Sequence, residues 1–266
     1  MSMETLKKLR DKTGAGISDC KKALDEASGD IEKAVEILRK KGISKASKRS
    51  DRETTEGIVK VLTDESDKEG YIVKINSETD FVSRNEKFQD LSDSIVNVIK
   101  EKKPANLEDL LSLAMENGSV KETVESLSGV IGEKLEISNL DVLKGEKVSA
   151  YSHMGGKIGV LVSFDKDVDN VLAQDIAMQI AATDPKYLKP EDVKEEELNK
   201  EKEIYKEQLI KEGKPENILD KIIEGKINKY YENVCLIKQE FIKEDKKKVE
   251  EVLGDVNILK FIRYSL

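Results

Sequence analysis

The chain has 266 residues, 38% of them charged, and a formal net charge of −8. This length suits about two domains, and the acidic excess argues weakly against nonspecific nucleic-acid binding, which needs a concentrated basic surface. With one histidine, His153, and two cysteines, metal sites built on several such ligands are excluded, as are catalytic triads unless His153 serves alone. No apolar run approaches the length of about 20 residues that spans a bilayer, and the N-terminus has no apolar signal core, so the expected location is cytoplasmic.

Residues 3–42 predict a compact three-helix unit. Ser18 is expected to cap the second helix and Asp30 the third, while Gly42 is expected to end the third helix as a C-terminal glycine. A basic connector follows at residues 44–52. We interpret this connector as a solvated linker, with an RNA contact as the alternative.

The next segments predict an α+β subdomain. Strand-like runs at residues 57–62 and 71–76 surround a polar turn and therefore form a hairpin. Apolar residues at helical spacing predict helices at residues 84–102 and 120–131. A strand at residues 136–143 completes this subdomain.

A second subdomain repeats the plan. Predicted strands at residues 148–151 and 158–162 flank a turn that contains His153, and a helix at residues 168–182 follows. The same order of hairpin and helix in both halves indicates two related α+β subdomains, each with a small antiparallel sheet.

An antiparallel helical hairpin is predicted at about residues 191–231, where dense Lys and Glu leave only a narrow apolar seam. It is followed by a predicted strand at residues 234–237, a short helix at 246–253 and a final strand at 258–264. The hairpin is therefore expected as an insertion in the second subdomain, with both of its neighbours in one sheet. The predicted fold class is α+β, with domains at residues 1–54, 55–143 and 144–266.

The glycine-rich turns do not match nucleotide-binding signatures. Gly14-Ala15-Gly16 lacks the third glycine and a preceding strand, and Gly155-Gly156-Lys157 lacks the Ser or Thr that should follow the lysine. His153 has no acid or nucleophile nearby in the sequence, which favours a contact role over that of a general base. We therefore expect a protein that is not an enzyme and that binds no metal or cofactor.

The stretch Ser77-Glu78-Thr79-Asp80-Phe81-Val82 places an aromatic ring beside a carboxylate at a predicted strand-to-helix turn. Surface turns are mostly polar, so Phe81 either anchors the following helix on the sheet or forms a wedge for another protein. Ser83 and Glu86 are spaced as a capping box for that helix. The residues alone favour the interpretation in which Phe81 and Val82 pin the helix to the sheet.

Residues 9–24 (LRDKTGAGISDCKKAL) closely resemble the N-terminal signature of the translation elongation factor Ts family, and residues 76–82 (NSETDFV) resemble its second signature. The resemblance extends in order over nearly the whole chain, through Ile131-Gly132-Glu133, residues 153–162, residues 184–192 and Phe261-Ile262-Arg263-Tyr264. Ser77 and Ser83 depart from it, because relatives often have Cys and Ala there. The chain also ends two residues after Tyr264, where some members continue into a further helix.

The resemblance implies a guanine nucleotide exchange factor for the GTPase elongation factor Tu, acting in protein biosynthesis. The three-helix unit would be ubiquitin-associated-like (UBA-like) and would touch the GTPase domain. The segment entering near the nucleotide's magnesium site would be Thr79, Asp80, Phe81 and Val82. Supporting partner contacts would come from Ile17, Ile131, Gly132 and His153.

Two other functional classes stay open at this point. A non-catalytic RNA- or protein-binding adaptor would use the basic connector and the three-helix unit, although net acidity counts against RNA. An enzyme would have to depend on His153 almost alone. Self-association through the helical hairpin is a further alternative for the oligomeric state.

Overall fold

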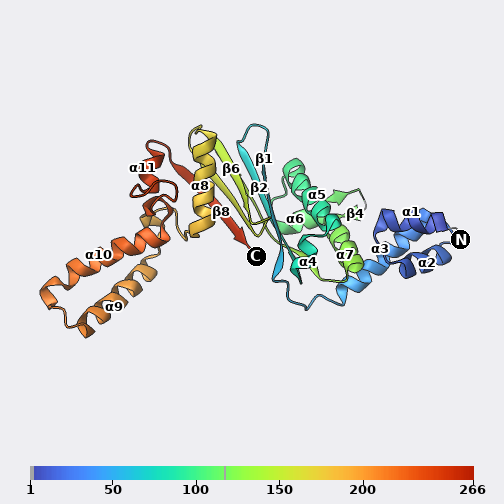
Figure 1. Ribbon diagram of the computed structural model, residues 1–266, viewed down its shortest axis with the longest axis horizontal. Coiled ribbons are helices and arrows are strands. Elements are labelled where there is room, and N and C mark those ends of the chain that lie inside the picture. Colours follow the sequence, from blue (N-terminus) through green and yellow to red (C-terminus); the bar gives the residue numbers. More distant parts are fainter. Residues whose placement is uncertain (1–2, 117) are drawn as a thin grey trace.

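The computed structural model describes residues 3–116 and 118–266. Within these residues, three helices lie at one end, two small antiparallel sheets form the centre, and a pair of long helices projects from the other end (Figure 1). The predicted α+β class is confirmed.

The N-terminal unit consists of α1 (Met3–Thr13), α2 (Ile17–Glu26) and α3 (Ile31–Ser47) around a small core of its own. Asp30 caps α3 as predicted, accepting a hydrogen bond of 3.1 Å from the Lys33 amide. Two expectations are wrong. Gly16 rather than Ser18 is the N-cap of α2, and α3 continues past Gly42 to Ser47, because Gly42 is buried against another helix.

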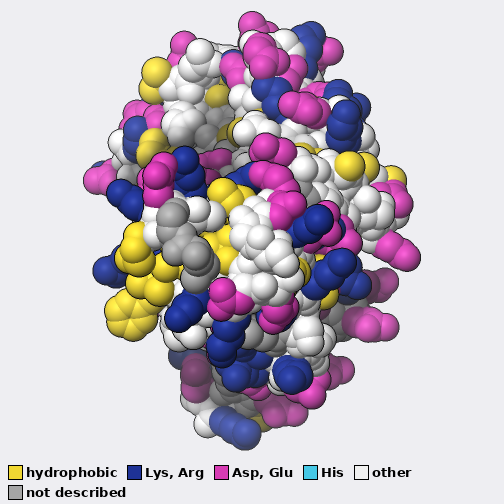
Figure 2. All heavy atoms as spheres, turned by 90° about the vertical axis from the view of Figure 1, so that its right-hand side faces the viewer, with side chains coloured by type: hydrophobic (Ala, Val, Ile, Leu, Met, Phe, Trp, Pro, Cys, Tyr) yellow, Lys and Arg dark blue, Asp and Glu magenta, His cyan; other side chains and the backbone are white. Residues whose placement is uncertain are grey.

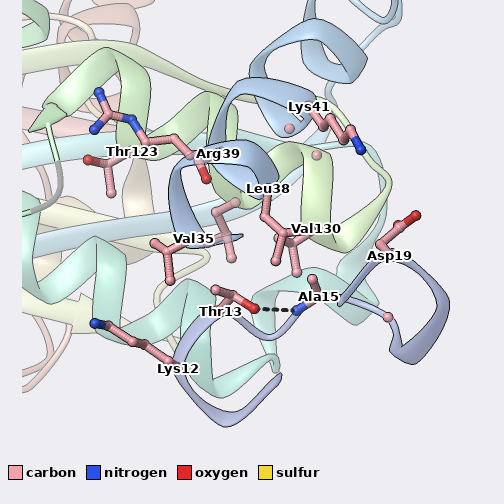
Figure 3. A pocket seen from close by; sticks show the side chains of 15 residues that line it. Lys12, Thr13, Ala15, Asp19, Val35, Leu38, Arg39, Lys41, Thr123 and Val130 are labelled. Carbon is pink, nitrogen blue, oxygen red and sulfur yellow. Dashed lines mark hydrogen bonds between the residues drawn. The ribbon is translucent and has the colours of Figure 1, made fainter. Parts of the chain in front are cut away.

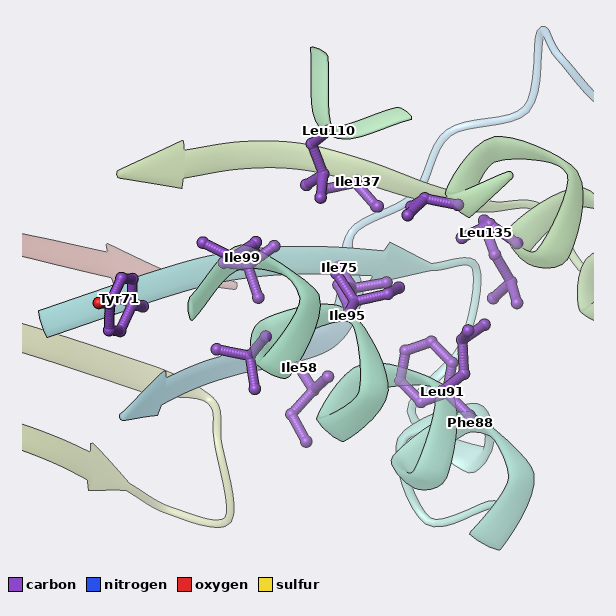
Figure 4. Close-up of a cluster of buried hydrophobic side chains, with 14 of the residues drawn as sticks. Ile58, Tyr71, Ile75, Phe88, Leu91, Ile95, Ile99, Leu110, Leu135 and Ile137 are labelled. Carbon is purple, nitrogen blue, oxygen red and sulfur yellow. The ribbon is translucent and has the colours of Figure 1, made fainter. Parts of the chain in front are cut away.

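The first sheet joins β1 (Glu56–Thr63), β2 (Glu69–Ser77) and β5 (Leu135–Lys144) in the order β1-β2-β5, all antiparallel. A core beneath one face is closed by α5 (Glu86–Lys102), α6 (Leu107–Ser112) and α7 (Val120–Ile131). In Figure 4, Ile95 of α5 lies beside Ile75 of β2, and Ile99 lies over β2 further toward Tyr71. A small ladder of β3 (Ala114–Met115) and β4 (Gly118–Ser119) precedes α7.

The start of α5 differs from the prediction. A separate short helix, α4 (Asp80–Ser83), follows β2, and α5 begins at Glu86. Asn85 is the N-cap of α5 and accepts a hydrogen bond of 3.3 Å from the Phe88 amide. The capping box expected from Ser83 and Glu86 is therefore wrong.

The second sheet joins β6 (Lys147–His153), β7 (Ile158–Phe164) and β8 (Ile258–Ser265), and α8 (Asn170–Thr183) and α11 (Val249–Leu253) cover its outer face. The two sheets pack face to face, burying Val59, Ile72, Leu143, Val148, Leu161 and Ile262 between them. Strands β2 and β7 are apolar on both faces for this reason, since one face meets helices and the other meets the opposite sheet.

The projecting helices are α9 (Glu195–Lys211) and α10 (Glu216–Val234), after a short 3-10 turn η1 (Pro190–Asp192). The strand predicted at residues 234–237 is wrong, because α10 runs to Val234 and a second 3-10 turn, η2 (Leu236–Lys238), follows. The insertion nevertheless begins and ends at one place. The Val234 carbonyl accepts hydrogen bonds of 3.0 Å from the amides of Lys186 and Tyr187. Of the helices described, none has the length and apolar character needed to cross a membrane.

Candidate functional site

The candidate site is the turn between β2 and α5, where Phe81 is 78% exposed and its neighbour Val82 is 3% exposed. Val82 packs into the core beneath the first sheet. The interpretation that both side chains pin the helix is therefore wrong for Phe81 and right for Val82. The exposed ring beside a buried anchor makes this turn the candidate contact surface.

The turn is fastened to the loop after α7 by hydrogen bonds in both directions. The Glu133 carboxylate accepts from the Thr79 amide at 2.9 Å and from the Thr79 hydroxyl at 2.7 Å. The residue before Thr79 and the residue after Glu133 are also paired: the Glu78 carboxylate accepts a hydrogen bond from the Lys134 amide at 2.6 Å. Two consecutive residues of one loop thus exchange hydrogen bonds with two consecutive residues of the other.

Glu78 also reaches the connector after α3, where both of its oxygens lie 3.1 Å from Nη1 of Arg52. Partial burial raises the pKa of Glu78, but the Lys134 amide and the Arg52 guanidinium outweigh it, so the pKa lies below its ordinary value. Glu78 is therefore ionised at neutral pH and holds both partners. The connector, predicted as a solvated linker, is attached to the site through Arg52.

Ile131 is the last residue of α7 and Gly132 is its C-cap, so both directly precede Glu133, which contacts the Thr79–Val82 turn. Ile131 packs against the core, and Gly132 ends α7 with a φ of +92°, a left-handed conformation that favours glycine. The left-handed conformation of Gly132 directs the chain after α7 toward residues 79–82 and places Glu133 against Thr79. The sequence offered Glu133 only as part of the Ile131-Gly132-Glu133 match, and its contact with Thr79 is seen only in the structure.

His153 ends β6, and its Nδ1 lies 2.9 Å from the Tyr151 hydroxyl. The following Met154 is 66% exposed, so this hairpin turn, like the Phe81 turn, presents an apolar side chain at the surface. This turn leans on β1, because the Val59 amide donates to the Gly156 carbonyl at 2.7 Å. Lys157 of this turn lies 3.7 Å from Glu56, the β1 residue that pairs with Ser77 just before the Phe81 turn.

Ile17 is the first residue of α2 and is 57% exposed. Helix α2 belongs to the three-helix unit and lies away from α4 (Figure 1), so Ile17 is not part of the Phe81 turn. Seen from this end, the surface mixes acidic and basic side chains, with hydrophobic side chains gathered toward one side (Figure 2). The predicted site residues therefore fall into three groups, at the Phe81 turn, the His153 turn and the start of α2.

A cavity of about 200 Å³ lies where the three-helix unit meets α7. Val35 and Leu38 of α3 and Val130 of α7 line it with Thr13 and Ala15, as Figure 3 shows. The ionic groups at its edge have partners of their own, since Arg39 lies 2.6 Å from Glu122 and Lys41 lies 2.6 Å from Glu26. The cavity is thus a gap in the packing between two units.

The model of one protein family, elongation factor Ts, matches residues 78–266. The match begins at Glu78, so it includes the Phe81 turn, the Glu133 loop and the His153 turn, and it spans more than half of the chain. The chain belongs to the elongation factor Ts family.

Proposed function

We propose that this protein is a guanine nucleotide exchange factor for elongation factor Tu in which the Phe81 turn disturbs the magnesium and phosphate side of the GTPase's nucleotide site. Membership of the family implies exchange on elongation factor Tu in translation. The finer assignment gives Thr79, Asp80, Phe81 and Val82 the role of the entering segment. Ile17, Ile131, Gly132 and His153 would add contacts, and the protein would act in the cytoplasm.

The observation that carries the proposal is the contrast between Phe81 and its surroundings. The ring is 78% exposed, while Val82 on one side is buried and Thr79 on the other is hydrogen-bonded to Glu133. An exposed ring on a fixed base has little conformational freedom to lose when a partner covers it, so more of its burial energy goes into binding.

Energy considerations require Phe81 to act together with other contacts. Exchange is negative coupling, because the factor weakens nucleotide binding and the nucleotide weakens factor binding by the same ratio. Each tenfold gain in GDP release lowers its barrier by about 1.4 kcal/mol, and burial of one Phe side chain supplies about 1.5–3 kcal/mol. Burial of this one side chain therefore accounts for a gain of about one or two decades in the rate of GDP release. Displacement of a magnesium ligand of the GTPase would accelerate release further. Asp80 is suited to help, because its carboxylate can accept hydrogen bonds from the displaced groups.

The test is stopped-flow release of a fluorescent GDP from elongation factor Tu. We expect Phe81→Ala to slow stimulated release by about one to two decades with an unchanged melting temperature. Val171→Ala is the matched control, because Val171 is 67% exposed at the start of α8 on the outer layer. Normal release with a lowered melting temperature would show that Phe81 serves the fold instead.

The adaptor alternative receives less support. It relied on the basic connector, yet Arg52 is paired with Glu78 and the Arg52 carbonyl accepts a hydrogen bond of 3.0 Å from Lys134. These groups hold the connector against the first subdomain. Steep salt-dependent RNA binding without any effect on GDP release would favour the adaptor.

A further inference from the structure

We infer that Glu133 is a positioning residue for exchange: its carboxylate orients the Phe81 turn before any partner arrives. The inference rests on the proposed function, because it assigns a cause to the orientation of Phe81. Its support is the crossed pair of carboxylate contacts formed by Glu78, Thr79, Glu133 and Lys134, which we call the crossed clamp.

The short helix that carries Phe81 cannot set its own direction. Helix α4 has four residues, and one turn of helix is unstable by itself, since nucleation fixes several dihedral angles for a single hydrogen bond. Its orientation therefore comes from attachments at its two ends. Val82 fixes one side by burial in the core, and Thr79 at the N-cap is the other attachment.

Thr79 is the N-cap residue of α4, but its side chain makes no capping hydrogen bond to that helix. A threonine at this position usually accepts a hydrogen bond from an amide of the first turn. Here the Thr79 hydroxyl donates to Glu133 Oε1, and the Thr79 amide donates to Glu133 Oε2. Both donors of one residue are taken by one carboxylate, which fixes the direction in which the chain enters α4. Hydrogen bonds to an ionised acceptor are also the stronger kind.

Glu133 is itself held in place by hydrogen bonds, so it fixes the turn relative to the core. The Ser128 hydroxyl donates to the Glu133 carbonyl at 2.6 Å, and the next amide, that of Lys134, is bound by Glu78. On the turn side, the Ser77 hydroxyl donates to the Thr79 carbonyl at 2.9 Å. Glu133 and Thr79 thus each have a second attachment to a regular element, Glu133 to Ser128 of α7 and Thr79 to Ser77 of β2.

Loss of the Glu133 carboxylate would leave Phe81 exposed but free to sample several orientations. Binding would then have to order the turn, and a small misplacement of a positioned group is known to reduce rates strongly. We expect Glu133→Ala to slow stimulated GDP release about tenfold. Glu133→Gln should recover most of the loss, because an amide accepts from the Thr79 amide and donates to its hydroxyl.

The experiment measures GDP release from elongation factor Tu with Glu133→Ala, Glu133→Gln, Phe81→Ala and the double variant Phe81→Ala/Glu133→Ala. If Glu133 acts through Phe81, Glu133→Ala changes little once the ring is gone. Glu146→Ala is the matched control, because the Glu146 carboxylate pairs with Lys68 at 2.8 Å and contacts no residue of the clamp. Additive losses in the double variant, or normal release by Glu133→Ala, would overturn the inference.

A second measurement on the free protein separates this inference from the proposed function. Amide hydrogen exchange at residues 79–83 should be faster in Glu133→Ala than in the unmodified protein and near normal in Glu133→Gln. If Phe81→Ala leaves GDP release unchanged, the wedge mechanism fails and with it the functional role of Glu133. Unchanged hydrogen exchange in Glu133→Ala rejects the crossed clamp alone.

Discussion

Gly129 of α7 packs directly on Gly42 of α3, where the two helices cross, and a β-carbon on Gly129 would lie 2.3 Å from the Gly42 α-carbon. This crossing joins the three-helix unit to the first subdomain, together with the 2.6 Å ion pair between Arg39 and Glu122. It also explains why α3 continues past Gly42. Glycine there serves the approach of two helices and not the end of one.

We expect Gly129→Ala to loosen this crossing, because the added carbon would meet backbone atoms that cannot move away singly. Amides in residues 38–47 should exchange hydrogen faster, while those in β1 and β2 stay protected. Gly225→Ala is the control, since Gly225 lies in helix α10 with open space at its β-carbon position. That change should be neutral or stabilising by about 0.5–1 kcal/mol. Equal behaviour of the two variants would contradict the tight crossing.

Glu69 makes stability depend on acid pH. Hydrogen bonds from Lys103, then from Lys144 and Tyr71, lower the pKa of Glu69 from 4.5 to about 2. A carboxylate with a lowered pKa in the folded state stabilises it fully above pH 4.5, and this contribution disappears as the pH falls toward 2. Urea unfolding of Glu69→Gln and of the unmodified protein should therefore differ at pH 6 and converge near pH 2. A difference that persists at pH 2 would show that packing, and not charge, is responsible.

Deleting the α9–α10 hairpin should leave a folded protein, for a reason that differs from the one the sequence predicted. Its ends do not lie in one sheet, but Val234 and Tyr187 are hydrogen-bonded at its base. The buried side chains of the hairpin, Leu209, Leu219 and Ile227, lie outside the four hydrophobic clusters of the remaining fold. Replacing residues 195–231 by a short Gly-Ser loop should preserve a cooperative thermal transition. Loss of that transition would show that the hairpin is part of the core.

Tyr264 of β8 ties the C-terminal strand to the first sheet, because its hydroxyl donates to the Asp141 carboxylate of β5. Burial, followed by this contact, raises the pKa of Tyr264, so the hydroxyl stays protonated at neutral pH. Tyr264→Phe should lower the free energy of unfolding by about 1.5–3 kcal/mol in urea titrations, the usual range for a hydrogen bond to a charged group. Tyr151→Phe, which removes a hydroxyl from an exposed turn contact, should have a smaller effect. Equal effects would argue against the link between sheets.

Most elements were predictable, because apolar periodicity is a local property. Helix α7 begins and ends as predicted at Val120 and Ile131, and β2 and β7 were recognised from short apolar runs. Predictions failed where a distant contact decides the local structure. Helix α3 continues because α7 covers Gly42. Residues 234–237 form no strand because α10 extends to Val234 and η2 follows, which leaves Cys235 with an isolated bridge to Tyr187.

The sequence by itself determined the α+β class, the order of elements and, through its motifs, the family to which the chain belongs. It also marked Phe81 as unusual without deciding whether the ring is core or surface. Only the tertiary structure decided that, because the answer depends on which of two adjacent side chains reaches the core, and Val82 does. Glu133 lies 54 positions from Thr79 in the chain. No local pattern can show that these residues meet, since their contact exists only when β2, α7 and β5 have packed together.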